Sequence, residues 1–347
     1  MTPARLGYKM PPEWAKHQRT FMEWPRREAL WPGPFEDVLP AFTTVVKTIA
    51  EFEPVSVLVH PELVQEATRF CGPGLELIPI EHNDSWMRDN GPTFLVNGRN
   101  ELAGVNWSFN AWGGKFPYHL DNLVAPKILK RFNVPCFDAP LVMEGGAFHV
   151  DGEGTLLTTR ECLLNPNRNP HLKPEEIETY LKEYLNVSKI IWLNRGWVGD
   201  DTDGHVDNLA CFVSPGLVIA QVCPDPSDPN YEVSQDNLKI LKNATDAKGR
   251  TLKVITIGQP PATYYNDLRL TLSYLNFYFV NAGIILPVFG YETFDKAALT
   301  TLQRVFPGRK IVTVDGLAIA RGGGNVHCLT QQMPAGIATD SDQLPND

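Results

Sequence analysis

Apolar runs and amphipathic segments alternate along the chain, and this pattern predicts strands and helices in turn. Apolar runs of strand length occur at residues 55–59, 75–80, 190–193 and 252–255. Helical spacing predicts helices over residues 35–52, 61–70, 122–132, 173–185, 234–248 and 294–305. Residues 10–25 show few regular signals, and we expect them to form an irregular segment packed on the core. Strands and helices that alternate in this way are typical of an α/β protein.

A pair of strands joined by a tight turn of Gly, Asn, Asp or Pro recurs four times. The predicted pairs are 93–96 with 101–107, 147–150 with 155–159, 209–213 with 217–222, and 274–280 with 284–288. The turns recur at roughly 55 to 70 residues, which is regular enough to indicate a repeated unit. We therefore predict modules around a common axis in one catalytic domain spanning residues 1–347, and no linker marks a boundary. The polar tail from about residue 336 is expected to fray.

Composition and charge narrow the class of protein. The 347 residues are 43% hydrophobic and 20% charged, as in ordinary soluble proteins. Forty acidic against 31 basic residues give a formal net charge of -9, which argues against nucleic acid as a partner and is compatible with a cationic substrate. Six scattered cysteines without a Cys-x-x-Cys pair are typical of reduced thiols in the cytoplasm.

The sequence also bears on location. Residues 1–20 lack the apolar run of a signal peptide, and the most apolar later segment, residues 277–289, is too short and interrupted to cross a bilayer. We expect a soluble cytoplasmic protein with no membrane partner. The oligomeric state is left open, with a homodimer as one arrangement.

Cys328 lies just after a run of three glycines, Gly322 to Gly324, near the C-terminus. Glycine carries no side-chain bulk, so a ligand can lie close against this backbone. Cys328 is the one thiol at the edge of such an opening, and a thiolate is a strong nucleophile when its pKa is lowered or a base stands nearby. We therefore interpret Cys328 as a candidate nucleophile.

His205 is the candidate base. It lies two residues from Asp207 on what reads as a strand, so both side chains should point to one face. Asp203 shares that parity if the extended geometry reaches back past the next glycine. His327 is adjacent to Cys328 and should point to the opposite face, so we prefer His205. Taken alone, a histidine at this position is more often structural than catalytic.

Two further carboxylates precede predicted strands at glycine-containing turns, Asp89 in RDNGP and Glu144 before a Gly-Gly pair. Taken alone, an aspartate there is most often a turn former, and Glu144 fits a surface carboxylate equally well. Together with Asp207, however, they suit a planar cation, because carboxylates can grip the edges of a guanidinium bidentately. The Cys328 thiol can then attack the central carbon while His205 handles protons.

Five separated motifs resemble those of the agmatine deiminases, a family grouped with the bacterial-type peptidylarginine deiminases in the guanidine-modifying superfamily. They are WMRD at 86–89, FNAWGG at 109–114, EGG at 144–146, DGHVDN at 203–208 and GGGNVHC at 322–328. The likeness runs from about residue 10 to residue 334, with the motifs in the same order. It implies a five-bladed, pseudo-symmetric α/β propeller of ββαβ-like modules, in agreement with the repeat noted above.

The resemblance also implies roles for particular residues. Asp89 and Asp207 would bind the guanidinium, Glu144 would support the site, His205 would be the acid and base, and Cys328 the nucleophile. The implied reaction converts agmatine to N-carbamoylputrescine and ammonia through a covalent cysteine thiouronium, without a cofactor or a metal. The remaining expected substrate-binding residues are Trp86, Trp112, Gly323 and Gly324, with the tryptophans covering the aliphatic chain.

Three alternatives remain beside this interpretation. A peptidylarginine deiminase would use the same chemistry on arginine residues. A metal-dependent hydrolase could use His205, Asp207, His327 and Cys328 as ligands, although no His-x-x-x-His or Cys-x-x-Cys spacing supports it. An inactive arginine- or polyamine-binding protein would not require the cysteine and the histidine, and both are present.

Overall fold

The structure is a computed structural model that describes residues 1–26 and 30–338. One unit recurs four times along the chain: an antiparallel hairpin, a helix, and a third strand parallel to the second. A helix joins the second and third strands because parallel neighbours need a long crossover. The four units are β4 (Thr93–Val96), β5 (Leu102–Ser108), α5 (Val124–Arg131) and β6 (Cys136–Val142); β7 (Phe148–Val150), β8 (Thr155–Thr159), α7 (Pro174–Leu185) and β9 (Lys189–Leu193); β10 (Ala210–Ser214), β11 (Leu217–Val222), α8 (Asn230–Asn243) and β12 (Lys253–Gly258); and β15 (Tyr278–Val280), β16 (Gly283–Val288), α9 (Glu292–Val305) and β17 (Lys310–Asp315).

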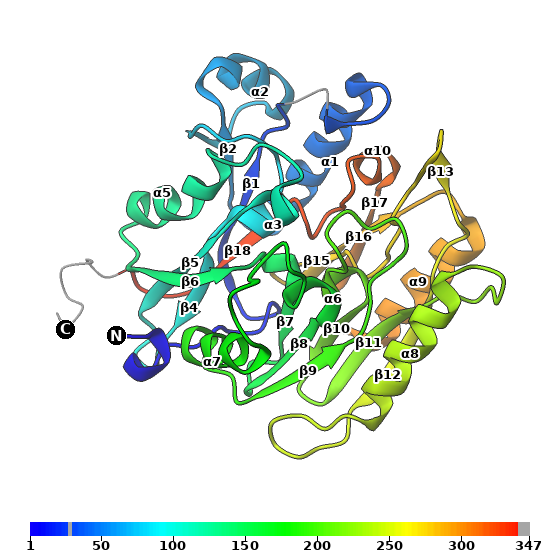
Figure 1. Cartoon of the computed structure of the whole chain (residues 1–347). Helices are drawn as coiled ribbons and strands as arrows, with labels where there is room; N and C mark the ends of the chain where they lie inside the picture. Colours follow the sequence, from blue (N-terminus) through cyan, green and yellow to red (C-terminus); the bar gives the residue numbers. More distant parts are fainter. Residues whose placement is uncertain (27–29, 339–347) are drawn as a thin grey trace.

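A fifth unit combines the two ends of the described chain. Strand β18 (Gln331–Pro334) pairs antiparallel with β1 (His17–Glu23), which pairs parallel with β2 (Val55–Val59) across α1 (Val38–Ala50). A further helix, α2 (Val64–Cys71), leads to β3 (Glu76–Pro79), which extends this sheet. Figure 1 shows the blue β1 and the red β18 side by side near the middle of the molecule. The described residues thus form five small mixed sheets of the same kind.

The remaining elements are short and lie in connections. They are the 3-10 turns η1 (Pro3–Leu6), η3 (Phe35–Asp37), η4 (Pro61–Leu63), η5 (Asp121–Leu123), η6 (Gly145–Ala147) and η7 (Val206–Asn208), the helices α3 (Met87–Asn90), α4 (Ala111–Gly114), α6 (Arg160–Leu163) and α10 (Leu317–Ala320), and the small hairpin of β13 (Tyr264–Tyr265) and β14 (Leu268–Arg269). Three of them directly precede the first strand of a unit: α3 before β4, η6 before β7 and η7 before β10. No helix within residues 1–26 and 30–338 is both long enough and apolar enough to span a membrane.

The apolar core lies between the sheets and their helices. Phe21 of β1, Phe94 of β4 and Leu129 of α5 belong to one buried cluster, which joins the sheet of β1 and β18 to the sheet of β4, β5 and β6. Helix α5 packs so closely on β5 that a side chain at Gly104 would overlap Leu129. Truncation of a buried Phe to Ala typically costs about 3–5 kcal/mol, so Phe21 helps to hold the terminal sheet in place.

Most of the predicted elements are confirmed, with shifts at their ends. The strands at residues 55–59, 93–96, 155–159 and 217–222 have the predicted bounds. Two predictions need larger corrections. The helix expected at 234–248 is Asn230–Asn243, and the strand expected at 274–280 begins only at Tyr278, because the preceding residues turn into the centre of the molecule.

The prediction for residues 10–25 was wrong, because His17–Glu23 is an inner strand of its sheet rather than an irregular segment. Its partner β18 comes from the other end of the chain, so local sequence gave no hint of the pairing. The start of the expected frayed tail is also ordered. Ile337 donates its backbone N–H to Asn100 at 2.8 Å and accepts one from Leu102 at 2.8 Å. Residues 339–347 lie outside the described residues.

Candidate active site

The segments that precede the first strands of all five units converge on one site. They supply Asp89, Glu144, the pair His205 and Asp207, then Asn276, and finally Cys328. Gly146 lies between three of these side chains. A Cβ atom there would lie 2.6 Å from Nδ1 of His205, 2.9 Å from Oδ1 of Asp89 and 3.0 Å from Oδ2 of Asp207. Only glycine leaves room for them at this distance, which explains the Gly-Gly pair after Glu144.

Cys328 is a buried thiol, with 4% of its surface exposed. Its Sγ lies 3.4 Å from Oδ2 of Asp207 and 3.1 Å from Nδ2 of Asn276, and its backbone N–H donates to Oδ1 of Asn276 at 3.3 Å. Burial raises the pKa of the thiol, and the carboxylates of Asp207 and Asp89 raise it further, to well above its ordinary value. The free protein therefore holds Cys328 as a thiol at neutral pH.

Cys328 opens onto a pocket that contains most of the predicted substrate-binding residues. Asp89, Trp86, Trp112, Gly323 and Gly324 all line it, whereas Asp207 does not. Trp86 stacks on Trp31 with ring centroids 5.2 Å apart. The other lining residues are Leu30, Asp84, Phe116, Asp201, Thr202 and Gly322. Aromatic walls with carboxylates among them are suited to an elongated cation.

The three glycines before Cys328 have different roles. A Cβ atom at Gly322 would lie 2.7 Å from Trp31, and one at Gly324 would lie 2.5 Å from Trp86 and 3.1 Å from Sγ of Cys328. Only Gly323 faces open space, and its φ of 98° is left-handed, which favours glycine. Two of the glycines therefore admit tryptophan rings, and the third provides the open backbone that the sequence predicted.

His205 is completely buried, yet neither ring nitrogen makes a hydrogen bond within the described residues. Nδ1 lies 3.7 Å from Oδ1 of Asp89, and Nε2 lies 3.7 Å from Oε2 of Glu144. Burial alone would lower the pKa of His205, but Asp89, Cys162 and Glu144 raise it well above its ordinary value. The raised pKa favours the charged imidazolium, and neither of its N–H groups is committed to a hydrogen bond within the described residues.

The two carboxylates beside His205 are held by different partners. Asp89 accepts from Nε1 of Trp112 at 2.9 Å and from the backbone N–H of Gly146 at 3.0 Å. Burial raises the pKa of Asp89, and the charge of His205 only partly offsets this. Glu144 accepts from Nε of Arg168 at 2.7 Å. Burial alone would raise the pKa of Glu144, but Arg168 and then His205 lower it below its ordinary value.

His327 lies on the other side of Cys328 and has partners for both nitrogens. Nδ1 is 2.9 Å from Oδ2 of Asp207, and Nε2 is 3.0 Å from both carboxylate oxygens of Glu13. Arg88 also donates to Glu13, at 3.3 Å, and to Gln332 at 2.8 Å. Arg88 therefore faces away from the pocket, as its neighbour Asp89 predicts.

Comparison with known proteins gives the family. The model of the Porphyromonas-type peptidyl-arginine deiminases matches residues 9–334, which is nearly the whole described chain. The chain belongs to this family. A putative agmatine deiminase of Legionella pneumophila (strain Paris) is 51% identical over 335 residues, which cover 96% of this chain and 97% of that protein.

Solved structures of the family agree with this assignment. The agmatine deiminase of Enterococcus faecalis is 40% identical with a TM-score of 0.93, over 97% of this chain and 98% of that one. A substrate-bound agmatine deiminase of C. jejuni, in which a cysteine is replaced by serine, is 32% identical with a TM-score of 0.88, over 95% and 97% of the two chains. A dimethylarginine dimethylaminohydrolase, 14% identical with a TM-score of 0.53, shares the fold over 91% of this chain and 100% of that one.

Two expectations about local geometry are wrong for this member of the family. His205 and Asp207 do not lie on a strand, because Val206–Asn208 is a 3-10 turn and the two side chains reach different partners. Asp203 does not share their face. Its φ of 62° turns the backbone, and its carboxylate accepts from Lys115 and Arg168 at 2.8 and 2.7 Å.

The structure also identifies partners that the sequence interpretation missed: Glu13, Arg168 and Asn276. Asn276 alone had a usable signal, because it stands before β15 where the other units carry Asp89, Glu144 and Asp207. Within the described residues, His205, Asp207, His327 and Cys328 do not form a cluster with metal-ligand spacing.

Proposed function

We propose that this protein hydrolyses agmatine to N-carbamoylputrescine and ammonia, with Cys328 as nucleophile and His205 as acid and base. One observation carries the proposal: a thiol and a buried histidine with two unbonded nitrogens stand among the carboxylates of Asp89, Glu144 and Asp207. The agmatine deiminases among the chain's relatives support the same reaction. The serine-for-cysteine replacement in one of them supports a cysteine nucleophile.

Asp89 and Asp207 are the proposed clamp for the guanidinium. Oδ1 of Asp207 has no hydrogen-bond partner within the described residues, and it is buried, so an N–H donor from the substrate would satisfy it. The positive charge of the bound guanidinium would also offset the carboxylates of Asp207 and Asp89, which raise the pKa of Cys328 in the free protein. Substrate binding would therefore favour loss of the thiol proton, so that the thiolate forms where it is used.

The thiolate of Cys328 would add to the guanidinium carbon and give a neutral tetrahedral intermediate. His205, whose raised pKa keeps it protonated at neutral pH, would give its proton to one amino group. Ammonia then leaves, and a thiouronium cation remains bound to sulfur. The neutral imidazole would next take a proton from water as its oxygen attacks. The C–S bond would then break as the sulfur takes up the remaining hydroxyl proton, which releases the neutral ureido product and restores the thiol. Glu144, fixed by Arg168, would hold His205 in place.

The five units are proposed to act as the blades of a pseudo-symmetric propeller around this site. The observation in favour is that each unit contributes the segment before its first strand, so substrate groups would be contacted from five directions. Such a site is held by sheets rather than by one flexible loop, which keeps the reacting groups at fixed distances.

The pocket favours agmatine over arginine on charge grounds. Asp84, Asp89 and Asp201 are among its lining residues, and no Arg or Lys is among those described. Agmatine is a dication, whereas the α-carboxylate of arginine would lie near these aspartates without a cationic partner. Trp86 and Trp112 can cover the aliphatic chain.

An ammonia-release assay with agmatine, arginine and a blocked arginine peptide side by side tests the proposal. We expect kcat/KM for agmatine to exceed that for free arginine at least about a hundredfold, roughly 2.7 kcal/mol of discrimination. Faster release from the peptide would instead favour a peptidylarginine deiminase.

Cys328→Ala tests the nucleophile separately. It should abolish turnover while agmatine still binds, because the carboxylates that hold the substrate remain. In the wild-type protein, a haloacetamidine should leave one adduct, on Cys328. Labelling at Cys71 or Cys211 in its place would contradict the assignment.

A further inference from the structure

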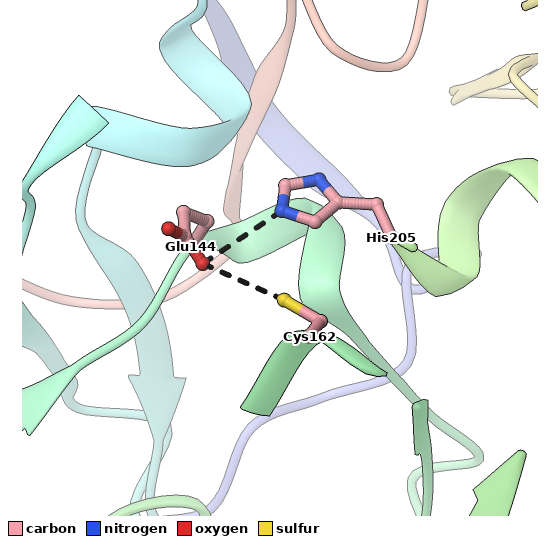
Figure 2. Close-up of side chains that lie close together, drawn as sticks. All are labelled: Glu144, Cys162 and His205. Carbon is pink, nitrogen blue, oxygen red and sulfur yellow. Dashed lines mark hydrogen bonds and ion pairs between the residues drawn. The ribbon is translucent and has the colours of Figure 1, made fainter. Parts of the chain in front are cut away.

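A second thiol, Cys162, lies beside the proposed acid and base and has no part in the reaction described above. It belongs to the short helix α6 and is completely buried. Its Sγ lies 3.9 Å from Oε2 of Glu144, the same oxygen that lies 3.7 Å from Nε2 of His205. Figure 2 shows the thiol and the imidazole directed at this oxygen from different elements.

These three side chains lie close enough together to share a metal ion. One atom each from Glu144, Cys162 and His205 lies within 4.8 Å of the others. Tetrahedral zinc, with bonds of about 2.0–2.3 Å, needs its ligand atoms roughly 3.3–3.8 Å apart. The two printed distances of 3.7 and 3.9 Å are therefore close to what zinc needs, and small movements of the side chains would complete the site.

His205 and Glu144 each direct one atom at the cluster, and a zinc ion would displace the proton of the imidazole. Nε2 of His205 is buried without a hydrogen-bond partner within the described residues. Arg168 binds Oε1 of Glu144 at 2.7 Å, which orients the carboxylate and leaves Oε2 toward the cluster. A ligand held by such an outer partner is already oriented for a metal.

The backbone also fixes Cys162 relative to His205. Thr159 accepts the N–H of Cys162 at 3.2 Å, and its hydroxyl donates to the carbonyl of Gly204 at 2.7 Å. One threonine thus ties the helix of Cys162 to the residue before His205. The distance between thiol and imidazole is therefore set by the fold and does not depend on the rotamer of an exposed chain.

We propose that Glu144, Cys162 and His205 form an inhibitory site for zinc. Thiolate, imidazole and carboxylate together are a zinc donor set, whereas magnesium and calcium prefer oxygen alone. Asp89, which lines the pocket, lies 3.7 Å from Nδ1 of His205, so the cluster is one side chain away from the pocket. An ion here would occupy the nitrogen proposed for proton transfer, so zinc would block the reaction. The metal binding stands on geometry alone, and only the inhibition rests on the proposed function.

Metal binding is tested on the full-length protein after treatment with a chelator. Equilibrium dialysis should show one zinc ion bound per chain, and cobalt(II) in its place should give the near-ultraviolet absorption of a cobalt–thiolate bond. Cys162→Ala should weaken zinc binding at least about a hundredfold and remove that absorption. The matched control is Cys71→Ala, which removes a buried thiol of α2 outside the cluster and should bind zinc as the wild type does.

Further outcomes separate this site from others. Loss of binding in Cys328→Ala but not in Cys162→Ala would put the metal on the nucleophile and overturn the proposal, as would dialysis without bound zinc. Should Cys162→Ala fail to fold, Cys162→Ser keeps the shape, and anomalous diffraction from zinc-soaked wild-type crystals locates the ion directly. Zinc should inhibit ammonia release by the wild type and by Cys71→Ala, but not by Cys162→Ala. A protein inactive on agmatine would fail the proposed function, while dialysis and cobalt absorption would still decide the metal site.

Discussion

Two histidines flank the site, and they differ in how fully their nitrogens are bonded. His205 and His327 are both buried, with 0% and 3% of their surfaces exposed. Both ring nitrogens of His327 lie within 3.0 Å of carboxylates, whereas those of His205 stay 3.7 Å from theirs. A ring nitrogen that already makes a short hydrogen bond to a carboxylate is not available to exchange a proton with the substrate. His205 keeps that place open at the cost of two buried, unbonded polar atoms.

The two sides of the site therefore differ in structure: the closed side contains His327 and its bonded carboxylates, and the open side contains His205. On the His327 side, Glu13 and Arg88 complete a closed set of buried charges that fixes Asp207 against Cys328. On the His205 side, Asp89 and Glu144 are close but not bonded to the ring. In the proposed reaction, the closed side would position the nucleophile and the open side would exchange protons.

Among the variants that compare the two sides, His205→Gln should have the largest effect. The variant keeps a polar side chain but cannot transfer protons, and both halves of the proposed reaction use this group. We expect kcat for ammonia release to fall about ten-thousandfold, the upper end for acid–base catalysis. Activity within tenfold of the wild type would move the proton-transfer role to another residue and break the comparison.

Asp89→Asn and Asp207→Asn test the two sides through their carboxylates. Loss of one partner of a buried charge pair costs roughly 2–5 kcal/mol, so kcat/KM should fall by about two to four orders of magnitude in each. The two variants should differ in thermal stability. The pKa of Asp89 is raised, so its charge destabilises the fold at neutral pH, whereas that of Asp207 is lowered and its charge stabilises it. Only Asp207→Asn should lower the melting temperature at pH 7.

Near-normal turnover in Asp207→Asn would mean that another carboxylate grips the guanidinium. Asp203 was one sequence-based candidate, but its bonds to Arg168 and Lys115 direct it elsewhere. The melting temperatures of Asp89→Asn, Asp207→Asn and the wild type should be measured at the same pH.

The side chains that face the site could be predicted from the sequence better than the partners that hold them. Asp89, Glu144 and His205 stand beside glycine-containing turns, and such turns before strands are a local signal that a sequence displays. Glu13 lies among prolines in an opening without periodicity, and Arg168 lies in a connection rich in Asn and Pro. Their roles come from contacts 314 and 24 residues away, to His327 and Glu144, which no local pattern reveals.

The fold was predictable to a similar degree. Hairpins with tight turns give a strong period-2 signal, so four of the five units were found. The fifth pairs β1 with β18, whose Gln331 and Gln332 are polar although they are buried. Asn276 was missed because it lies in an apolar aromatic run that reads as strand, although its place before β15 was a signal. In the structure it bonds to Sγ and to the backbone N–H of Cys328.

His327→Gln should affect stability more than chemistry. Glutamine can still donate to Asp207, but the charge between two buried carboxylates is lost, which costs about 3–5 kcal/mol. We expect a value near 3 kcal/mol by denaturant titration, because Arg88 still neutralises Glu13. Activity of the folded variant should stay within about tenfold of the wild type, on the scale of one or two hydrogen bonds.

The same variant has a testable pH dependence. Burial and Arg88 alone would lower the pKa of His327, but Glu13 and Asp207 raise it above its ordinary value. A raised histidine pKa stabilises the fold fully below the unfolded pKa, and the stabilisation is lost as pH rises through the folded pKa. The wild type should therefore lose stability above about pH 6.5, and His327→Gln should lose less. An identical decline in both would assign it to His205, whose pKa is raised as well.

The smallest expected effect concerns the reactivity of Cys328 without substrate. Burial and then the carboxylates of Asp207 and Asp89 raise its pKa, so only a small fraction is thiolate at pH 7. Alkylation of Cys328 by neutral iodoacetamide should be slow at pH 7. Its rate should rise about tenfold per pH unit and should continue to rise above about pH 8.5, where the rate for free cysteine levels off. A cationic haloacetamidine brings its own charge and should react at least about tenfold faster at pH 7. Peptide mapping confirms the labelled residue, and the unfolded protein gives the reference rate. A plateau near pH 8.5, with equal rates for the two reagents, would mean that the closed side preforms the thiolate, contrary to the role assigned to it here.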